Sequence, residues 1–316
     1  MRCLICGGKS LPLIENLYDD RYGAIGKHTI YVCTDCGFGK TVPGLKKSGI
    51  AKFYSRYYPL KSIEASTVKA EAKLIPLWLR WFTGIDHSAH FHIIPKTTVL
   101  DIGSGIGASL LEIELMGAKA YGVEPDPNAQ RLAKELNLNV YIGFITDNPF
   151  PKLQFDYITA SQVLEHEPDP RKFLKATYKR LKVNGQVILS FPHLNAVYRK
   201  IFGKRWLHWH VPYHLNFFTE KSFRILAQQC GYKVVKMRTI TPNIWTYLQL
   251  KMLKLIPLEG RVNPIWASPN GNIPRRNIEL DFQMKVIYQG MAVLNRIIDL
   301  TGWGESFLVF LKKFDE

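Results

Sequence analysis

Long apolar runs are missing from this sequence. No uninterrupted apolar stretch reaches the roughly 18 residues that a membrane-spanning helix needs. The first residues, MRCLICGGKS, also lack the apolar segment of a secretory signal. Internal repeats and low-complexity tracts are absent too, which excludes a repeat architecture. With 316 residues and an ordinary hydrophobic fraction of 47%, we expect a cytoplasmic globular protein with a sizeable core.

Acidic residues are scarce relative to basic ones. Asp and Glu number 26 against 42 Lys and Arg, which gives a net charge of +16 and a pI near 9.6. The excess is spread along the chain, without a block of like charges at either end. This balance favours an acidic partner. Nucleic acid, a phosphorylated substrate and an anionic membrane surface are the three alternatives. A basic surface without a specific partner remains an alternative.

Cysteine is rare, and four of the five cysteines fall into two closely spaced pairs. They form two C-x2-C motifs, Cys3 with Cys6 and Cys33 with Cys36. In a reducing compartment such pairs more often bind zinc than form disulfides, because four thiolates complete a tetrahedral shell. The sequence therefore predicts a structural Zn2+ in an N-terminal zinc ribbon, with a redox pair as the alternative. Cys230 is expected to be a small buried hydrophobe.

Glycine is concentrated in one stretch, VLDIGSGIGASLLEIELMGAKAYGVEPD, which runs from Val99 to Asp126. A short aliphatic run, closely spaced glycines and a helical pattern predict a strand, a tight turn and a helix. Glu124 then ends a second strand, where its carboxylate is placed to accept hydrogen bonds from a ribose diol. The unit predicts a nucleoside site. A dinucleotide fingerprint can also be fitted to Gly103, Gly105 and Ala108, so the glycines alone leave the ligand open.

Four blocks together carry a resemblance: VLDIGSGIG, GVEPD, FDYITASQVLEH and NGQVILSFPH. In this order they resemble Rossmann-like (class I) S-adenosylmethionine-dependent methyltransferases, over roughly residues 96–240 with a return near 305. The resemblance implies S-adenosylmethionine as cofactor. In that family the glycine turn approaches the methionine part, the acid binds the ribose hydroxyls, and residues after the third and fourth strands flank the adenine and the methyl. The implied cofactor residues are Asp101, Gly103, Ser104, Gly105, Glu124, Pro125, Phe144, Ile145, Ser161 and Gln162.

One position departs from the family pattern. Many relatives place an acid soon after the third strand to bind the adenine amino group. Here the segment YIGFITDNPF offers Asp147 only after several apolar residues.

The alternation of strand and helix patterns predicts an α/β fold. We expect a Rossmann-like, mainly parallel seven-stranded sheet with helices on both faces, a small N-terminal zinc ribbon and a helical insertion before the last strand. The expected units are a zinc ribbon at 1–45, a helical connector at 46–95, the methyltransferase core at 96–240, a helical insertion or cap at 241–303 and the final strand at 304–316. The order of the ribbon, the aromatic segment IAKFYSRYYPLKS, a helix and the methyltransferase core also resembles bacterial methyltransferases of sugar and surface-polysaccharide pathways, on looser motifs.

Histidines gather in the segment FPHLNAVYRKIFGKRWLHWHVPYHLNFFT, at and after the end of the expected fifth strand, QVILSFP. Methyl transfer needs alignment and a deprotonated nucleophile, and histidine titrates near neutrality. His214 is the first candidate for the base, and His166 in LEHEPDP is the second. The alternative is that His214 only ties its loop by hydrogen bonds while His208 and His210 lie at the surface. A metal pair at His210 and His214 is disfavoured, because Pro212 interrupts any helix between them.

The leading hypothesis is an enzyme that methylates a small or lipid-linked acceptor, such as a phosphorylated sugar or polysaccharide intermediate. An RNA methyltransferase is the alternative, because zinc ribbons and positive charge also serve RNA-binding enzymes. Against it, the segment SQVLEH stands where many base-amine methyltransferases have an N/D-P-P-Y/F tetrad. A non-catalytic zinc-ribbon scaffold is a third hypothesis, which the intact glycine turn disfavours.

The insertion at 241–303 is expected to cap the substrate cleft and to touch an anionic membrane, on the inner face. Six apolar residues fall close to one helical face: Ile244, Trp245, Leu248, Met252, Leu255 and Ile256. Lys251 and Lys254 are placed to meet lipid headgroups. The alternative is that this stripe packs onto the protein's own core, as most amphipathic helices do.

Overall fold

The computed structural model describes residues 1–57, 63–266 and 282–314. Its main sheet has seven strands: β4 (Thr98–Ile102), β5 (Lys119–Glu124), β6 (Val140–Ile142), β7 (Phe155–Ser161), β8 (Leu181–Pro192), β10 (Tyr232–Ile240) and β11 (Ser306–Lys313). Their order across the sheet is β10-β11-β8-β7-β4-β5-β6. Only β11 runs antiparallel to its neighbours, and every other pairing is parallel. The predicted fold class is confirmed.

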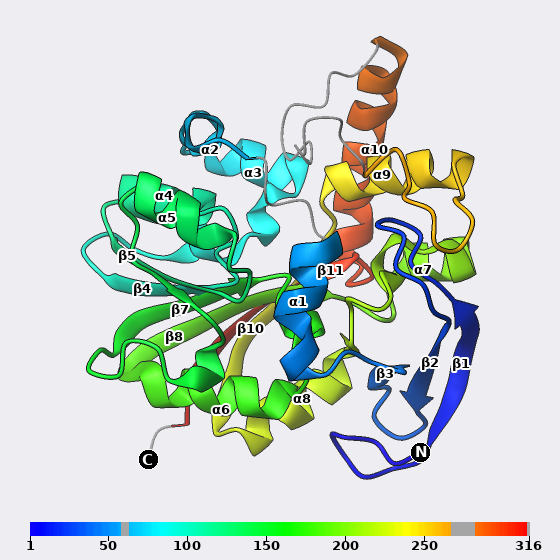
Figure 1. Ribbon diagram of the computed structural model, residues 1–316, viewed down its shortest axis with the longest axis horizontal. Helices are drawn as coiled ribbons and strands as arrows, with labels where there is room; N and C mark the ends of the chain where they lie inside the picture. Colours follow the sequence, from blue (N-terminus) through cyan, green and yellow to red (C-terminus); the bar gives the residue numbers. More distant parts are fainter. Residues whose placement is uncertain (58–62, 267–281, 315–316) are drawn as a thin grey trace.

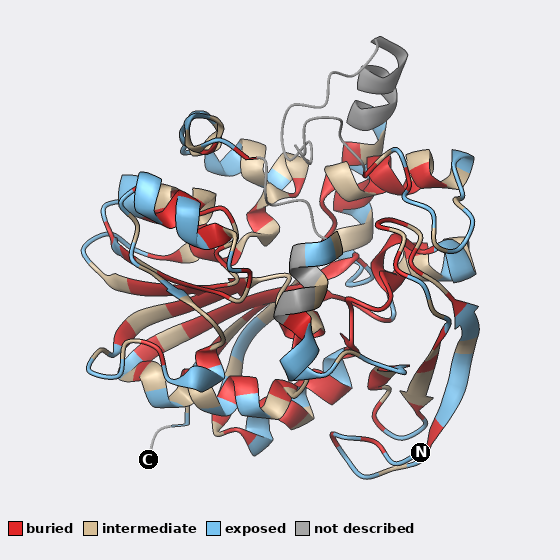
Figure 2. Ribbon diagram, in the orientation of Figure 1, coloured by how far each residue is buried: buried red, intermediate tan, exposed pale blue. Residues whose placement is uncertain are grey.

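Helices cover the two faces of this sheet (Figure 1). They are α4 (Ala108–Leu115) and α5 (Ala129–Glu135) on one face, and α6 (Pro170–Arg180) and α8 (Glu220–Gln229) on the other. Local sequence sets their starts. The Asp169 carboxylate accepts hydrogen bonds from two amides of the first turn of α6, and Thr219 with Ser222 forms a capping box on α8. Figure 2 shows the buried strands between the two layers.

A second sheet holds the N-terminal residues. Its strands are β1 (Ser10–Leu17), β2 (His28–Cys33), β3 (Gly39–Val42) and β9 (Asn216–Phe217), in the order β1-β2-β3-β9. The strand β9 comes from the segment that follows β8, so the large domain completes the sheet of the small one. Phe38 packs on Phe218 with ring centroids 5.4 Å apart, and both side chains belong to the main core. The N-terminal unit is therefore fused to the rest, and a boundary at residue 45 stays a prediction.

Helices make up much of the segment between β3 and β4. It contains α1 (Lys47–Tyr57), α2 (Ala65–Glu71) and α3 (Leu77–Thr83), followed by the short 3-10 turns η1 (Ile85–His87) and η2 (Ala89–His92). Pro76 lies directly before α3, where its missing amide costs no helical hydrogen bond. The amide of Ala89 donates to Ser161 Oγ at 2.8 Å. This bond ties the connector to the end of β7.

Further short elements lie in the loops after the strands: η3 (Ile145–Asp147), η4 (Leu164–His166), α7 (Val197–Phe202), η5 (Gly203–Arg205) and η6 (Leu207–Trp209). Two helices, α9 (Asn243–Lys254) and α10 (Phe282–Leu300), stand between β10 and β11. Asn295 of α10 donates to Asn243 Oδ1 at 2.9 Å and to Thr246 Oγ1 at 3.0 Å. These buried bonds fix α9 against α10. Residues 267–281 of the expected insertion lie outside the described residues.

The apolar stripe of α9 mostly faces inward. Leu248 and Met252 are buried in a cluster with Tyr22 and Tyr213, and Ile244 and Trp245 are partly buried beside it. Leu255 and Ile256, just beyond the helix, are exposed. The apolar stripe within α9 thus packs mainly onto the protein's own core. Contact of this region with a membrane stays a prediction. Among the residues that the structure describes, none of the helices combines the length and apolarity needed to cross a bilayer.

His193 predicts how stability depends on pH. Its Nδ1 donates to the Gly304 carbonyl at 3.2 Å, and burial lowers its pKa to about 4. The unfolded imidazole has a pKa of about 6.5, so between pH 6.5 and 4 only the unfolded chain takes up this proton. The free energy of unfolding should therefore fall over this interval, by up to about 3 kcal/mol for this group. Thermal melts from pH 7 to 4 should show a smaller loss in His193→Gln, and an unchanged slope would contradict the assignment.

Candidate functional site

A cavity of about 490 Å³ lies at the carboxyl ends of the parallel strands. Every residue that the sequence predicts for the cofactor lines it: Asp101, Gly103, Ser104, Gly105, Glu124, Pro125, Phe144, Ile145, Ser161 and Gln162. The two candidate bases, His166 and His214, line it as well. In open α/β sheets this edge is where ligands bind. The structure thus brings the predicted residues together, and their individual roles stay predictions.

The turn after β4 needs its glycines. Gly103 has φ +74, and a Cβ at this position would lie 2.4 Å from Val163 Cγ2. Gly105 has φ +55, and its amide donates to Glu124 Oε2 at 2.8 Å. Both positions favour glycine for conformation, and Gly103 also for space. At these two glycines the turn therefore presents backbone, and no side chain, to the cavity.

Glu124 ends β5 and is held by two amides, from Gly105 at 2.8 Å and Asp126 at 3.0 Å. A carboxylate has about four acceptor positions, so the same group can accept from a vicinal diol on its cavity side. This arrangement links the acid and the glycine turn into one unit. It fits the nucleoside ribose that the sequence predicts.

Asp101 and Ser104 complete this half of the cavity. The Asp101 carboxylate accepts from Ser109 Oγ and Thr159 Oγ1, both at 2.6 Å, and its burial raises its pKa. Asp101 therefore joins α4 to β7 at the cavity floor. Ser104 Oγ is buried and has no hydrogen-bond partner among the described residues. An unsatisfied hydroxyl at this place fits a polar ligand.

The loops after β6 and β7 form the far end. Phe144 lies under Lys47 Nζ at 4.8 Å from the ring centroid, and Lys47 forms a 2.6 Å ion pair with Asp147. Asp147 also accepts from the amide of Phe144 at 2.8 Å. Asp147 therefore fastens α1 over this loop. Its side chain does not line the cavity. From the loop after β6, Gly143, Phe144 and Ile145 line the cavity.

The second half of the cavity is lined by imidazoles. His166 Nδ1 donates to the Tyr213 carbonyl at 3.0 Å, and His214 Nδ1 donates to the His208 carbonyl at 2.8 Å. The rings of His166 and His214 are 4.6 Å apart. Burial lowers the pKa of His166 to about 4 and that of His214 well below its usual value. His208 and His210 are also buried, rather than at the surface. His214 therefore ties its loop through Nδ1 and still lines the cavity.

The sequence analysis missed two ionisable residues at or beside this half of the cavity. Glu165 is fully buried, neither carboxylate oxygen has a hydrogen-bond partner among the described residues, and burial raises its pKa to about 8. Its Oε1 lies 4.0 Å from His214 Nε2. Arg21, from the loop between β1 and β2, reaches the cavity, and its guanidinium lies 4.3 Å from the Trp266 ring centroid. In the sequence, only its neighbour His166 drew attention to Glu165, and nothing pointed to Arg21.

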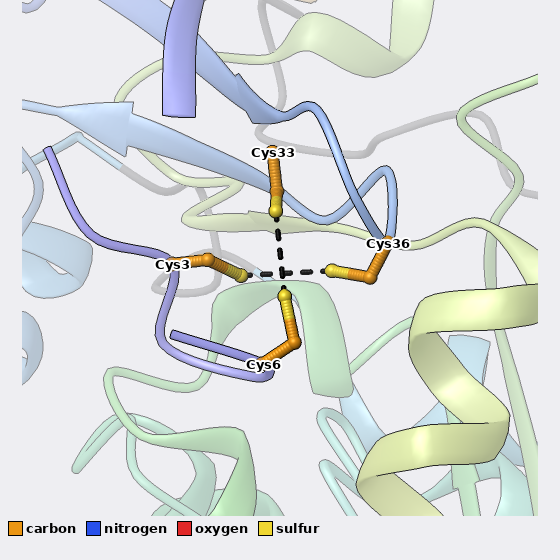
Figure 3. Close-up of side chains that lie close together, drawn as sticks. All are labelled: Cys3, Cys6, Cys33 and Cys36. Carbon is orange, nitrogen blue, oxygen red and sulfur yellow. Dashed lines mark hydrogen bonds between the residues drawn. The ribbon is translucent and has the colours of Figure 1, made fainter. Parts of the chain in front are cut away.

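The four N-terminal cysteines converge (Figure 3). Cys3 Sγ lies 3.6 Å from Cys36 Sγ, Cys6 Sγ lies 3.4 Å from Cys33 Sγ, and all four sulfurs are within 4.8 Å of one another. Sulfurs 2.3 Å from a tetrahedral ion would stand about 3.8 Å apart. The thiols are free rather than joined as disulfides. This donor set fits a zinc ion. Burial alone would raise the pKa of Cys33, but hydrogen bonds from backbone amides and the Cys6 thiol outweigh it and lower the pKa to about 7.

The family model described as "Methyltransferase domain" matches residues 70–237, more than half of the chain. Phosphoethanolamine N-methyltransferase 2 of Caenorhabditis elegans is 28% identical over 161 residues, which cover 47% of this chain and 35% of that protein. The ubiquinone biosynthesis O-methyltransferase of Pseudomonas putida (strain GB-1) is 32% identical over 132 residues, which cover 40% of this chain and 54% of that protein. The chain thus spans about a third to a half of the length of these relatives.

Among solved structures, the cyclase SpnF is similar with a TM-score of 0.51 and 14% identity, covering 86% of this chain and 98% of that one. At this identity the likeness shows the fold alone. That structure bears the name of a cyclase, so the fold by itself does not decide the reaction.

Proposed function

Because the chain belongs to the methyltransferase-domain family, we propose that it transfers a methyl group from S-adenosylmethionine to a small acceptor held in the same cavity. One observation carries this proposal. The cavity joins the glycine turn and Glu124 on one side to a group of buried imidazoles on the other. A cofactor half and an acceptor half thus share one cavity.

The chain's own residues would mainly align the reactants. Bound S-adenosylmethionine supplies an electrophilic methyl carbon on a sulfonium. The turn at Gly103 and Gly105 and the carboxylate of Glu124 would fix its position, as effective concentration and orientation require. His214 and His166 face the acceptor half as neutral imidazoles, because burial lowers both pKa values. A neutral imidazole can take the proton of an acceptor hydroxyl or amine.

We further propose that the acceptor is small or lipid-linked and carries phosphate, as a sugar or polysaccharide intermediate does. A cavity of about 490 Å³ must hold the cofactor and the reacting group together, so only a small reacting group can enter. Arg21 is buried at the cavity, where its Nη2 donates to the Leu207 carbonyl. Its Nε lies 4.0 Å from Asp20 Oδ1 and has no hydrogen-bond partner among the described residues. A guanidinium in that state suits a phosphate. A lipid-linked acceptor would also explain exposed Leu255 and Ile256 next to Lys254.

The cysteine cluster is proposed to hold one structural Zn2+. Four thiolates leave no position for water or substrate, so this ion would take no part in the reaction. Its site is fused to the large domain through β9. The ion would therefore stabilise the wall that carries His214.

Cofactor binding tests the proposed function. S-adenosylmethionine should bind the purified chain, and NAD should not. Glu124→Ala should weaken that binding by about 1.5 to 3 kcal/mol, or roughly 10- to 150-fold, since charge-assisted hydrogen bonds are lost. Glu135→Ala is the matched control, because Glu135 pairs with Arg131 on the exposed side of α5. Isothermal calorimetry measures all three proteins. Tight binding of NAD without binding of the methyl donor would refute the proposal.

The acceptor can be found with methyl-labelled cofactor. The chain is incubated with fractionated cell extract, and label is followed into glycan, lipid and RNA fractions. Label in a phosphorylated glycan or lipid-linked fraction is expected. Label confined to RNA would replace this acceptor class by the RNA alternative.

A further inference from the structure

A second set of metal-ligating groups lies beside the cavity. Glu165, His166 and His214 each offer one ligand atom, and these atoms all lie within 4.8 Å of one another. We propose that they bind a divalent first-row transition metal on the acceptor side of the cavity. The binding site itself stands on geometry alone, and its role in the reaction rests on the proposed function.

The two imidazoles are oriented as metal ligands usually are. Each uses Nδ1 to donate to a backbone carbonyl, Tyr213 for His166 and His208 for His214. In a neutral imidazole this leaves the lone pair on Nε2, because a carbonyl can only accept. A hydrogen bond from the second nitrogen is what fixes tautomer and ring orientation at metal sites. The two histidines come from η4 and from the loop after η6, so tertiary structure brings them together.

Glu165 supplies the strongest argument. It is fully buried, and among the described residues neither of its oxygens has a hydrogen-bond partner. A buried, unsatisfied carboxyl group is costly in either protonation state. Its Oε1 already lies 4.0 Å from His214 Nε2. A cation between these atoms would satisfy both.

The donor set indicates the class of ion. Two imidazoles and one carboxylate suit zinc, iron, cobalt or manganese, and they leave coordination positions open. Ligand atoms about 2.1 Å from an ion stand about 3.0 to 3.4 Å apart, so the side chains must close by roughly 1 Å. His210 stands nearby, with its ring 4.9 Å from that of His214 and its Nε2 lacking a hydrogen-bond partner among the described residues. It is a candidate fourth ligand.

An ion here would hold the acceptor. The set carries one negative charge at most, so a bound divalent ion leaves a net positive site that faces the cavity together with Arg21. An acceptor hydroxyl or phosphate oxygen could fill an open position, and coordination would lower the pKa of the hydroxyl. In that case His214 serves as a ligand rather than as the base.

Metal counting on the full chain tests the site. After saturation with Zn2+ and removal of excess ion, wild type should retain about two ions per chain by elemental analysis, one at the thiolates and one here. Glu165→Gln, which keeps the shape of the side chain, should retain one. Its affinity for the second ion should fall at least about 100-fold. Glu167→Gln is the matched control, because Glu167 is also a buried carboxylate at the cavity but lies outside the ligand set.

Titration with Co2+ gives a second measurement that needs no variant. Wild type should show two classes of site, one with sulfur-to-cobalt charge-transfer absorption and one without. Saturation at a single ion with only the sulfur signature would overturn the proposal, as would a second ion that survives in Glu165→Gln. Calorimetry with S-adenosylmethionine separates the two proposals. Cofactor binding without a second ion leaves the proposed function standing, and the reverse result leaves only the metal site.

Discussion

Changing Cys33 to serine is expected to remove one zinc ion per chain and to destabilise the protein by several kcal/mol. The four sulfurs already stand 3.4 to 3.6 Å apart in pairs, so the loss of one opens the tetrahedral shell. Structural zinc contributes about 10 to 16 kcal/mol of apparent binding free energy in isolated zinc-finger peptides. Here the unit also shares a core with the large domain, so the loss should be smaller. Elemental analysis and denaturant unfolding measure the two effects.

The same change should reach the cavity. Thr41 of β3 donates through its hydroxyl to the His214 carbonyl at 2.6 Å, and its amide donates to Leu215 at 3.0 Å. Loosening of β3 therefore loosens the backbone of His214, and turnover should fall more than cofactor affinity. Cys230→Ser is the matched control, because Cys230 is a buried thiol outside the cluster. Full zinc content and unchanged stability in Cys33→Ser would refute the structural role.

Local sequence patterns were enough for the sheet and the glycine turn. β7 and β10 fall on the segments FDYITAS and YKVVKMRTI, because buried strands carry apolar and β-branched runs that neighbouring turns delimit. The cysteine spacing likewise marked four residues that the fold brings together. The strands and the glycine turn are encoded by residues close in sequence, and the cluster is encoded by cysteine, a residue type with few other uses.

Contacts between distant segments were beyond such patterns. Arg21 enters the cavity from the N-terminal unit, and β9 joins that unit's sheet from more than 170 residues away in the chain, as the pairing of Gly39 with Phe217 shows. The sequence showed the apolar stripe on α9 but not the residues that it packs against, because hydrophobic periodicity identifies the apolar face of a helix and not its contacts. Glu165 resembled a solvated acid next to His166. Only tertiary structure reveals that it is buried.

His214→Ala is expected to lower turnover about 10²- to 10⁴-fold, the range for loss of a general base. Affinity for S-adenosylmethionine should change little, because Glu124 and the glycine turn lie on the other side of the cavity. Single-turnover transfer of labelled methyl at saturating acceptor measures the first quantity, and calorimetry measures the second. An unchanged rate would leave His214 only its hydrogen bond to the His208 carbonyl, and His166→Ala would then be measured.

The control for this variant is His193→Ala. His193 is also a buried histidine after β8, but it donates to Gly304 and is not part of the lining of this cavity. Equal losses in both variants would indicate destabilisation rather than chemistry. Metal content then assigns the role. A slow His214→Ala variant that retains the second ion identifies His214 as the base, whereas loss of the ion together with the rate identifies it as a ligand.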